Sequence, residues 1–332
     1  MPGSHASRRT LVTGGAGFIG SHLVEMLCAQ GERVTVVDNL STGRRENLEQ
    51  VPSDALELLV GDVSSVLPTL DPGQFAAVYH LAAAVGVRLV IEQPIHTIET
   101  NVLETSAVLS FAAAASLPTL VASTSEVYGK GVRTPFAEDD DVLYGPTIFS
   151  RWSYACSKAI DEYLALAYHA ERGLPATIVR FFNTVGPRQV GDYGMVLPRF
   201  VEAALDGRTL EVHGDGRQSR CFCDVRDLVP ALPRLLGDAR HHGRVFNLGN
   251  DRPIEILALA ELVRDTLGSA SDIATVPYEE AFAVGFEDMR RRQPDLARIR
   301  AAIGFEPRIP LEQTIRDLAQ HILAARRAGR VA

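Results

Sequence analysis

The chain has 332 residues, with 33 basic against 41 acidic side chains and a formal net charge of −8. This length is enough for one large or two ordinary domains, and the acidic balance without a long basic stripe argues against nucleic-acid binding. We expect no membrane association, because no run of 18 apolar residues and no signal peptide is recognisable. The four cysteines indicate reduced thiols in a cytoplasmic protein, and Cys221-x-Cys223 lacks a second Cys/His pair that would make a metal site.

The stretch TLVTGGAGFIG at residues 10–20 predicts a buried strand, a glycine turn and the start of a helix. Gly14, Gly17 and Gly20 follow one another at three-residue spacing, one residue longer than the common dinucleotide fingerprint. An ordinary turn would also explain the glycines. However, a strand, a glycine turn and a helix together form an arrangement that holds a pyrophosphate on backbone N–H groups.

A second predicted strand at 32–37 ends at Asp38, eighteen residues after Gly20. An acidic side chain at that place can accept hydrogen bonds from the adenosine ribose and would repel a 2′-phosphate. The sequence therefore favours NAD over NADP, although Arg44 and Arg45 close behind weaken that preference.

Further strands are predicted at 55–60, 77–81, 119–122 and 176–180, with helices at 94–115 and 153–172. Strands that alternate with helices predict a parallel sheet covered on both faces. Beyond residue 182 the pattern becomes irregular, with a helix at 198–205, strands at 210–213 and 245–249, and a helix at 253–267. We expect an α/β fold: a Rossmann-type doubly wound parallel sheet in residues 1–182, with a returning segment near 221–250, and a smaller C-terminal α+β substrate lobe in residues 183–332.

Tyr154 and Lys158 lie four residues apart on the predicted helix at 153–172 and so share one face. This spacing is common by chance, but here it follows a dinucleotide-type half and a strand that ends in Ser and Thr residues. An ammonium beside a phenol favours the phenolate, so Tyr154 can remove a hydroxyl proton while hydride leaves the same carbon. Thr124 or Ser125 would then hydrogen-bond the same substrate oxygen.

Several motifs together resemble the extended short-chain dehydrogenase/reductase family: TGGAGFIG, TSEVYG, YACSK and RFFNTVGPR, with Asp38 and Asn101. Members of this family act on nucleotide sugars as epimerases, dehydratases and decarboxylases. The resemblance implies tightly bound NAD that is regenerated in each cycle, a UDP-sugar substrate and a homodimer. The dimer would form through the helices that contain Asn101 and Tyr154. Ile160, Leu164 and Tyr168 would suit its seam, although core packing explains them as well.

Glu126 and Arg220 narrow the resemblance to the UDP-glucuronate decarboxylases, which include the UDP-xylose synthases. The implied reaction gives UDP-xylose through a 4-keto intermediate, with Glu126 moving a proton at C5. Other roles remain open, since Glu126 could hold a sugar hydroxyl and Arg220 a UDP phosphate. The alternative function is a 4-epimerase of UDP-glucose or UDP-glucuronate. A 4,6-dehydratase or a non-catalytic NAD-binding protein is less favoured.

The residue patterns and the resemblance together give the expected members of each site, and Arg88 lies in a loop that departs from the family pattern. The expected catalytic residues are Thr124, Ser125, Glu126, Tyr154, Lys158 and Arg220. The expected cofactor-binding residues are Gly14, Gly17, Phe18, Ile19, Gly20, Asp38, Asn39, Asp62, Val63, Leu81, Ala82, Ala83, Asn101, Ser123, Tyr154 and Lys158. The expected substrate-binding residues are Arg88, Asn183, Arg188, Val196, Leu197, Arg220 and Arg292. Arg88 could equally be a solvated loop charge or a dimer contact, and Arg292 could belong to a surface basic cluster.

Overall fold

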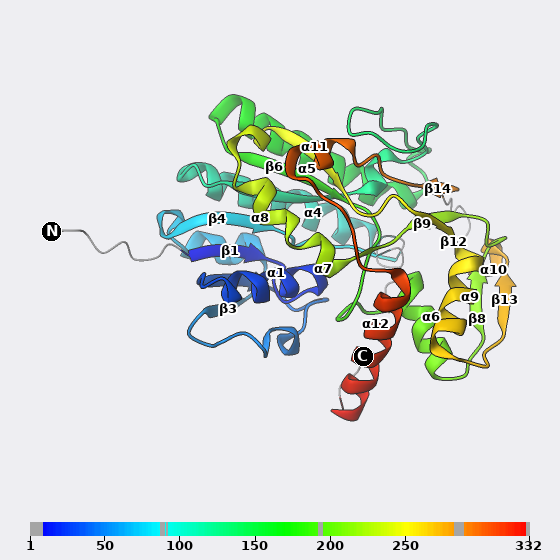
Figure 1. Cartoon of the computed structure of the whole chain (residues 1–332). Coiled ribbons are helices and arrows are strands. Elements are labelled where there is room, and N and C mark those ends of the chain that lie inside the picture. Colours follow the sequence, from blue (N-terminus) through cyan, green and yellow to red (C-terminus); the bar gives the residue numbers. More distant parts are fainter. Residues whose placement is uncertain (1–8, 87–89, 91, 192–194, 282–288, 330–332) are drawn as a thin grey trace.

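A computed structural model describes residues 9–86, 90, 92–191, 195–281 and 289–329. Its centre is a seven-stranded sheet in the order β11-β6-β5-β4-β1-β2-β3, in which every neighbouring pair is parallel (Figure 1). The strands are β1 (Arg9–Thr13), β2 (Val34–Asp38), β3 (Leu56–Val60), β4 (Phe75–His80), β5 (Thr119–Thr124), β6 (Ala176–Phe181) and β11 (Arg244–Leu248). The direction of strand addition reverses between β1 and β4. Ligands bind at such a reversal, beyond the carboxyl ends of the strands.

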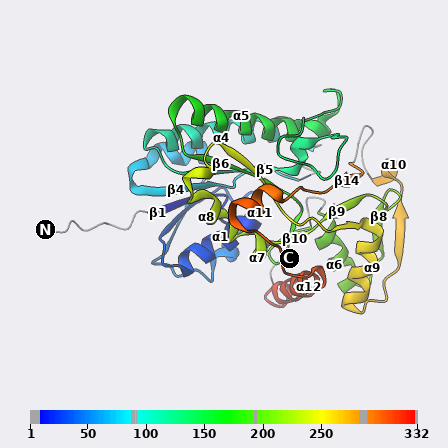
Figure 2. The same cartoon turned by 45° about the horizontal axis from the view of Figure 1, so that its top comes forward.

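Helices cover both faces of this sheet, as Figure 2 shows in a turned view. One face packs on α1 (Phe18–Ala29), α7 (Val225–Leu228), α8 (Ala231–Leu236) and α11 (Ala297–Ile303). The other face packs on α2 (Val63–Val66), α4 (Pro94–Ala114) and α5 (Ser153–Arg172). The inner strands β1, β2, β5 and β6 are buried on both faces, as a parallel sheet requires, whereas the edge strand β3 is partly exposed.

A second hydrophobic core lies beside the sheet, around Phe200, Leu259 and Ile315. It is formed by α6 (Val196–Leu205), β8 (Leu210–His213), α9 (Ile256–Leu267), β13 (Ile273–Val276) and α12 (Leu311–Arg327). Smaller pairings involve β7 (Thr184–Val185) with β10 (Cys223–Asp224), and β12 (Pro253–Glu255) with β9 (Ser219–Cys221) and β14 (Arg291–Arg292). The remaining elements are α10 (Tyr278–Ala281) and the 3₁₀ turns η1 (Arg45–Leu48), η2 (Leu67–Thr69), η3 (Pro72–Gln74), η4 (Ser125–Tyr128), η5 (Ser150–Trp152) and η6 (Ala239–His241).

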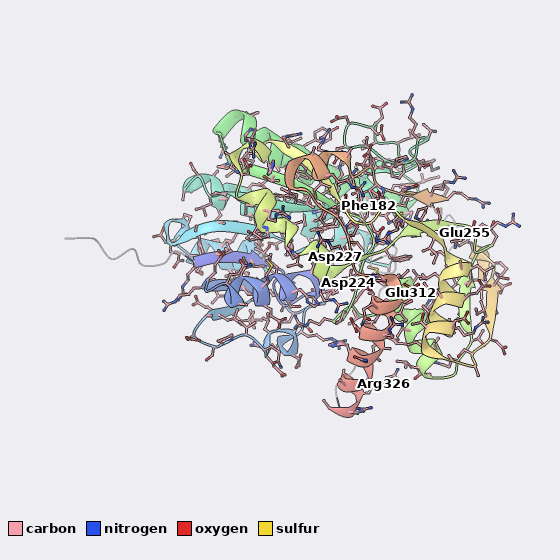
Figure 3. The ribbon with its side chains drawn as sticks, viewed as in Figure 1. Phe182, Asp224, Asp227, Glu255, Glu312 and Arg326 are labelled. Atoms are coloured by element: carbon pink, nitrogen blue, oxygen red, sulfur yellow. The ribbon has the colours of Figure 1, made fainter. Side chains whose placement is uncertain are left out.

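Two acidic residues at α7 attach the C-terminal segment to the rest of the chain. The Thr314 hydroxyl donates a 2.7 Å hydrogen bond to Asp224, and the backbone N–H groups of Arg308 and Ile309 both donate to Asp227. Figure 3 labels Asp224 and Asp227 beside the C-terminal part of the ribbon. These bonds fix the direction in which α12 enters the second core.

The predicted fold class is confirmed, with small differences at the element boundaries. The helix expected at 253–267 starts only at Ile256, because Pro253–Glu255 pairs antiparallel with Ser219–Cys221 as β12. We propose that the chain divides near residue 182 and that segment 221–250 returns to the first domain. The pairing of β11 with β6 and the separate core around Phe200 support that division.

Candidate active site

A cavity of about 920 Å³ lies at the carboxyl ends of the central strands. Its wall carries residues that directly follow β1, β2 and β4, the last residues of β5 and β6, and side chains from the second core. Nearly all of the predicted site residues that the structure describes line it. Arg88 lies outside the described residues.

The glycine turn forms one end of this cavity. Gly14 has φ +70°, and a Cβ on it would lie 2.6 Å from the backbone nitrogen of Ala82. A Cβ on Gly20 would collide with the carbonyl oxygen of Gly14. The N-cap residue of α1, Gly17, has no side chain to cap the helix, and the first-turn residues Phe18, Ile19 and Gly20 line the cavity. Such a terminus attracts phosphate through its N–H groups and the helix dipole.

Asp38 and Asp62 stand at the same end, on the wall formed by β2 and the loop after β3. The Asp38 carboxylate accepts hydrogen bonds from the backbone N–H groups of Ala16 at 2.9 Å and Leu40 at 2.8 Å. Asn39 donates a 2.8 Å hydrogen bond to Asp62. The glycine turn therefore holds Asp38 in place, and its negative charge would disfavour a 2′-phosphate there.

Asn101 is the one described member of the predicted set that does not line the cavity. It is buried behind the wall, where its Oδ1 accepts from the Ala84 backbone N–H at 2.8 Å and its Nδ2 donates to the Ser157 hydroxyl at 3.1 Å. It braces the loop after β4 against α5. The sequence could not distinguish this position from a cavity-facing one.

Tyr154 and Lys158 project from the first turns of α5 into the cavity, and both are buried. Burial raises the pKa of Tyr154, the charge of Glu126 raises it further, and a hydrogen bond with Thr124 opposes these effects. The phenol is therefore protonated in the protein alone. A positive charge added beside it would favour the phenolate.

Glu126, at the start of η4, is held between two arginines. Its carboxylate lies 2.6 Å from Arg151 on η5 and 2.6 Å from Arg292 on β14. Burial would raise the pKa of Glu126, but Arg292 and Arg151, with a contribution from Arg220, lower it to about 2. The pairing of β14 with β9 aligns Arg292 with Arg220, which brings three cations around this carboxylate.

The sequence reasoning missed Arg151. It precedes Tyr154 by three residues, so the turn that starts α5 delivers both side chains to the cavity. The reasoning also missed Asp161, whose carboxylate lies 2.6 Å from the Lys158 ammonium. An acid three residues after a lysine on one helix face could have indicated that pair.

The predicted substrate residues lie toward the second core. The buried Asn183 Oδ1 has no hydrogen-bond partner within the described chain, and the side chain lines the cavity. Arg188 lies against α1, where it contacts Glu25 at 2.6 Å and the Ser21 hydroxyl at 3.3 Å. Val196 and Leu197 begin α6 and form an apolar part of the wall.

Comparison with known proteins gives a family match over residues 10–249, to the NAD dependent epimerase/dehydratase family. The chain belongs to this family. It is 42% identical to the UDP-N-acetyl-alpha-D-glucosaminuronate decarboxylase of Bacillus cytotoxicus, over 94% of this chain and 97% of that protein. It is 37% identical to UDP-glucuronic acid decarboxylase 2 of Arabidopsis thaliana, over 97% of this chain and 70% of that protein.

Among solved structures, the UDP-glucose 4-epimerase of Thermotoga maritima with UDP-glucose matches with a TM-score of 0.85 and 27% identity, over 96% of this chain and 99% of that one. The resemblance to the extended short-chain dehydrogenase/reductase family is confirmed, as is the prediction of an NAD-dependent nucleotide-sugar enzyme of the decarboxylase/epimerase type. In the part of the chain that the structure describes, no helix is both long and apolar enough to cross a bilayer. Within the same residues, no group of three His, Cys, Asp or Glu side chains is arranged to hold a metal ion.

Proposed function

We propose that the protein is an NAD-dependent decarboxylase of a UDP-activated hexuronate, with UDP-glucuronate as substrate and UDP-xylose as product. The observation that carries this proposal is the convergence of Tyr154, Lys158 and Thr124 with Glu126 and its arginines in one cavity. The first three suit oxidation at a sugar hydroxyl, and the cationic surroundings of Glu126 suit a sugar that carries its own carboxylate. The homology to decarboxylases along nearly the full chain supports the same reading.

The residues present fit NAD. The open N-terminus of α1 suits its pyrophosphate, and the Asp38 carboxylate suits the adenosine ribose. Lys158 would bind the ribose of the nicotinamide half. When bound, NAD supplies a hydride acceptor at C4 of the sugar and returns that hydride at the end of the cycle. We further propose that NAD remains tightly bound between cycles.

In the proposed reaction, Tyr154 removes the proton from O4 and Thr124 donates a hydrogen bond to the same oxygen. The Lys158 ammonium stabilises the phenolate. Once C4 is a ketone, the carboxylate at C5 lies β to it, so loss of CO₂ leaves an enolate whose charge rests on O4. Tyr154, which carries the proton removed from O4, and Thr124 are placed to stabilise that charge. Protonation at C5 and reduction at C4 then give the product.

We propose that Glu126 acts at C5 of the sugar rather than at C4. Because Arg151 and Arg292 keep it ionised, it can accept a proton or order a water molecule, but it donates a proton only after one of these cations moves to the substrate. An entering sugar carboxylate offers those cations an alternative partner. We therefore propose that substrate binding loosens the ion pairs of Glu126 and raises its pKa toward the range useful for proton transfer.

Two alternatives have specific support. UDP-N-acetylglucosaminuronate is a second candidate substrate, because the relative at 42% identity is named for it. A UDP-sugar 4-epimerase uses the same Tyr154 and Lys158 step without loss of CO₂, and the solved 4-epimerase shares the fold.

The test is to incubate the purified protein separately with UDP-glucuronate and UDP-N-acetylglucosaminuronate and to follow the products by NMR. The proposal predicts a pentose nucleotide and CO₂ from UDP-glucuronate. Turnover of the acetylated sugar alone would move the assignment to that substrate. A galacturonate nucleotide would establish the epimerase, and no product from either sugar would overturn the proposed function.

We also propose a homodimer formed through α4 and α5. Leu103 and Ile95 on α4 and Tyr163 on α5 are exposed at 60, 71 and 68%, and Ile160 is 40% exposed. Leu164 and Tyr168, which the sequence offered for the same seam, instead pack against the core beneath α5. Large exposed apolar side chains gathered on adjoining helices favour a partner surface.

A further inference from the structure

Asp161 does not line the cavity, yet it directly contacts a residue that does. It lies on α5 three residues after Lys158, and its Oδ2 is 2.6 Å from the Lys158 Nζ. The side chains of Lys158 and Asp161 are 2% and 0% exposed, so water screens neither charge. Burying an ammonium without a counter-charge is costly, and Asp161 supplies the counter-charge to Lys158 in this position.

The geometry of the pair also directs the lysine. A lysine ammonium has three N–H donors on a flexible stem. Within the described chain, the one hydrogen bond that the Lys158 ammonium makes is to Asp161. Two N–H groups then remain for acceptors on the cavity side, which is the number needed to hold a diol such as a ribose.

A line of buried polar side chains connects Asp161 to Thr13, the residue before the glycine turn. The Thr105 hydroxyl faces the Asp161 carboxyl and counters part of the rise in its pKa that burial causes. His80 Nε2 lies 3.0 Å from the Thr105 hydroxyl, and His80 Nδ1 lies 2.8 Å from the Thr13 hydroxyl. Thr13 in turn accepts from the backbone N–H of Ala82, which borders the cavity beside Gly14.

These groups have one arrangement in which every hydrogen has an acceptor. Burial, aided by the charge of Lys158, lowers the pKa of His80 to about 3, so the ring is neutral and carries a single N–H. Thr13 then donates to Nδ1 and Nε2–H donates to Thr105, which leaves the Thr105 hydroxyl hydrogen available to Asp161 Oδ1, an oxygen that accepts no other hydrogen bond in the described chain. The line therefore has a fixed direction and ends on a carboxylate that Lys158 also contacts.

We infer that Asp161 is a positioning residue. It holds the Lys158 ammonium toward the nicotinamide half of the cofactor and at a fixed position relative to the glycine turn. This inference rests on the cofactor assignment in the proposed function and not on the identity of the sugar. Asp161 touches neither ligand, so its effect passes through Lys158. It should matter for the half of NAD that Lys158 reaches and leave the adenosine half unaffected.

The test compares the binding of NADH and ADP, measured calorimetrically on the full chain after any bound nucleotide has been removed. Asp161→Asn keeps the shape and removes the charge. We expect its NADH affinity to fall about tenfold or more, while its ADP affinity stays within about twofold of wild type. Glu171→Gln removes one charge from an exposed position on the same helix and should change neither affinity. Unchanged NADH binding by Asp161→Asn, or an equal loss for NADH and ADP, would overturn the inference.

Thr105→Val provides a second variant if Asp161→Asn does not fold. It removes the hydroxyl between His80 and Asp161 while keeping the shape of the side chain. We expect a smaller effect of the same kind: the affinity for NADH falls about threefold and the affinity for ADP does not change. Equal binding of NADH by Thr105→Val and wild type would count against the polar line as the anchor of Asp161. Because neither measurement needs turnover, a wrong choice of sugar would leave this test intact.

A pH profile of the reaction adds a readout that simple loss of packing would not move. The charged and polar groups that act on the Tyr154 phenol are Thr124 at the end of β5, Glu126 in η4, Arg292 on β14 and Asp161 on its own helix. Asp161→Asn removes one negative charge from the surroundings of the Tyr154 phenol. In the pH profile of kcat/KM, the decline on the acid side should therefore occur at lower pH in this variant than in wild type, and the maximum value should be smaller. A lower plateau with an unmoved limb would indicate a purely structural role and contradict the inference.

Discussion

The carboxylate of Glu126 raises the pKa of the Tyr154 phenol, although both residues belong to the same proposed reaction. Arg151 and Arg292 keep that carboxylate ionised, so in the protein alone the base is protonated and the neighbouring acid is charged. Tyr154 must lose its proton to act as the base at O4, and Glu126 must gain one if it is to donate a proton at C5. A cationic cofactor beside Tyr154 and an anionic sugar beside the arginines would each move one of them in the required direction.

Glu126→Gln should separate the two halves of the reaction. We expect overall decarboxylation to fall at least about 100-fold, because the group that serves C5 is lost. Reduction of NAD on mixing with UDP-glucuronate should persist, and its acid limb should move to lower pH, since a negative charge beside Tyr154 has been removed. Stopped-flow absorbance of NADH and product NMR measure the two halves. Full overall activity in this variant would show that the proton-transfer role of Glu126 is wrong.

The same carboxylate makes a testable contribution to acid stability. Its pKa is lowered from 4.5 to about 2 in the folded chain. A lowered pKa stabilises the fold fully above the unfolded value of 4.5, and that contribution is lost as the pH falls through 2. The difference corresponds to about 3 kcal/mol of unfolding free energy. Urea unfolding at pH 7 and pH 3 should show a smaller loss for Glu126→Gln than for wild type, and equal losses would contradict the ion-pair arrangement.

Arg292 and Arg290 offer a matched pair of substitutions on one segment. The Arg292 side chain is 12% exposed and contacts Glu126, whereas that of Arg290 is 74% exposed and contacts Asp215 at the surface. We expect Arg292→Met to weaken UDP binding about tenfold or more, because a guanidinium suits a phosphate. Arg290→Met should bind UDP like wild type. Similar calorimetric results for the two variants would show that Arg292 does not bind the UDP phosphates.

The proposed dimer depends on the exposed side chains of α4 and α5. Leu103→Asp and Tyr163→Asp place a charge where apolar groups would meet, and each should convert the dimer to a monomer with the fold retained. Light scattering coupled to size exclusion measures the mass, and circular dichroism provides the control for folding. An unchanged mass in the double variant would exclude this surface as the interface.

The sequence was sufficient to predict the helices and strands that are determined by a short stretch of neighbouring residues. The glycine spacing before α1 and the apolar strands predicted the central sheet, and the bounds of α5 agree with the structure, because a glycine and a proline follow its last turn. The clustering of three arginines around Glu126 could not be predicted in this way. Arg220 and Arg292 meet through pairing of the two-residue strand β14 with β9, a contact between segments 72 positions apart that leaves no periodic pattern.

The role of Asn101 could not be predicted from the sequence either. A polar residue in a long helix suits either a ligand or a buried brace, and only the position of Ala84 and Ser157 distinguishes the two. Asp161 was overlooked because it acts on Lys158 and not on the cavity. Residues that support others are difficult to recognise until their neighbours are known.

The central claim is that oxidation at C4 precedes loss of the carboxyl group in this cavity. UDP-glucuronate that carries ¹³C at C6 tests it by rapid mixing, with NADH absorbance and labelled CO₂ followed on one time course. We predict that NADH forms before labelled CO₂ is released, and that deuterium at C4 slows the formation of NADH. Release of labelled CO₂ with no prior NADH, or a product that retains the labelled carboxyl group, would contradict this order.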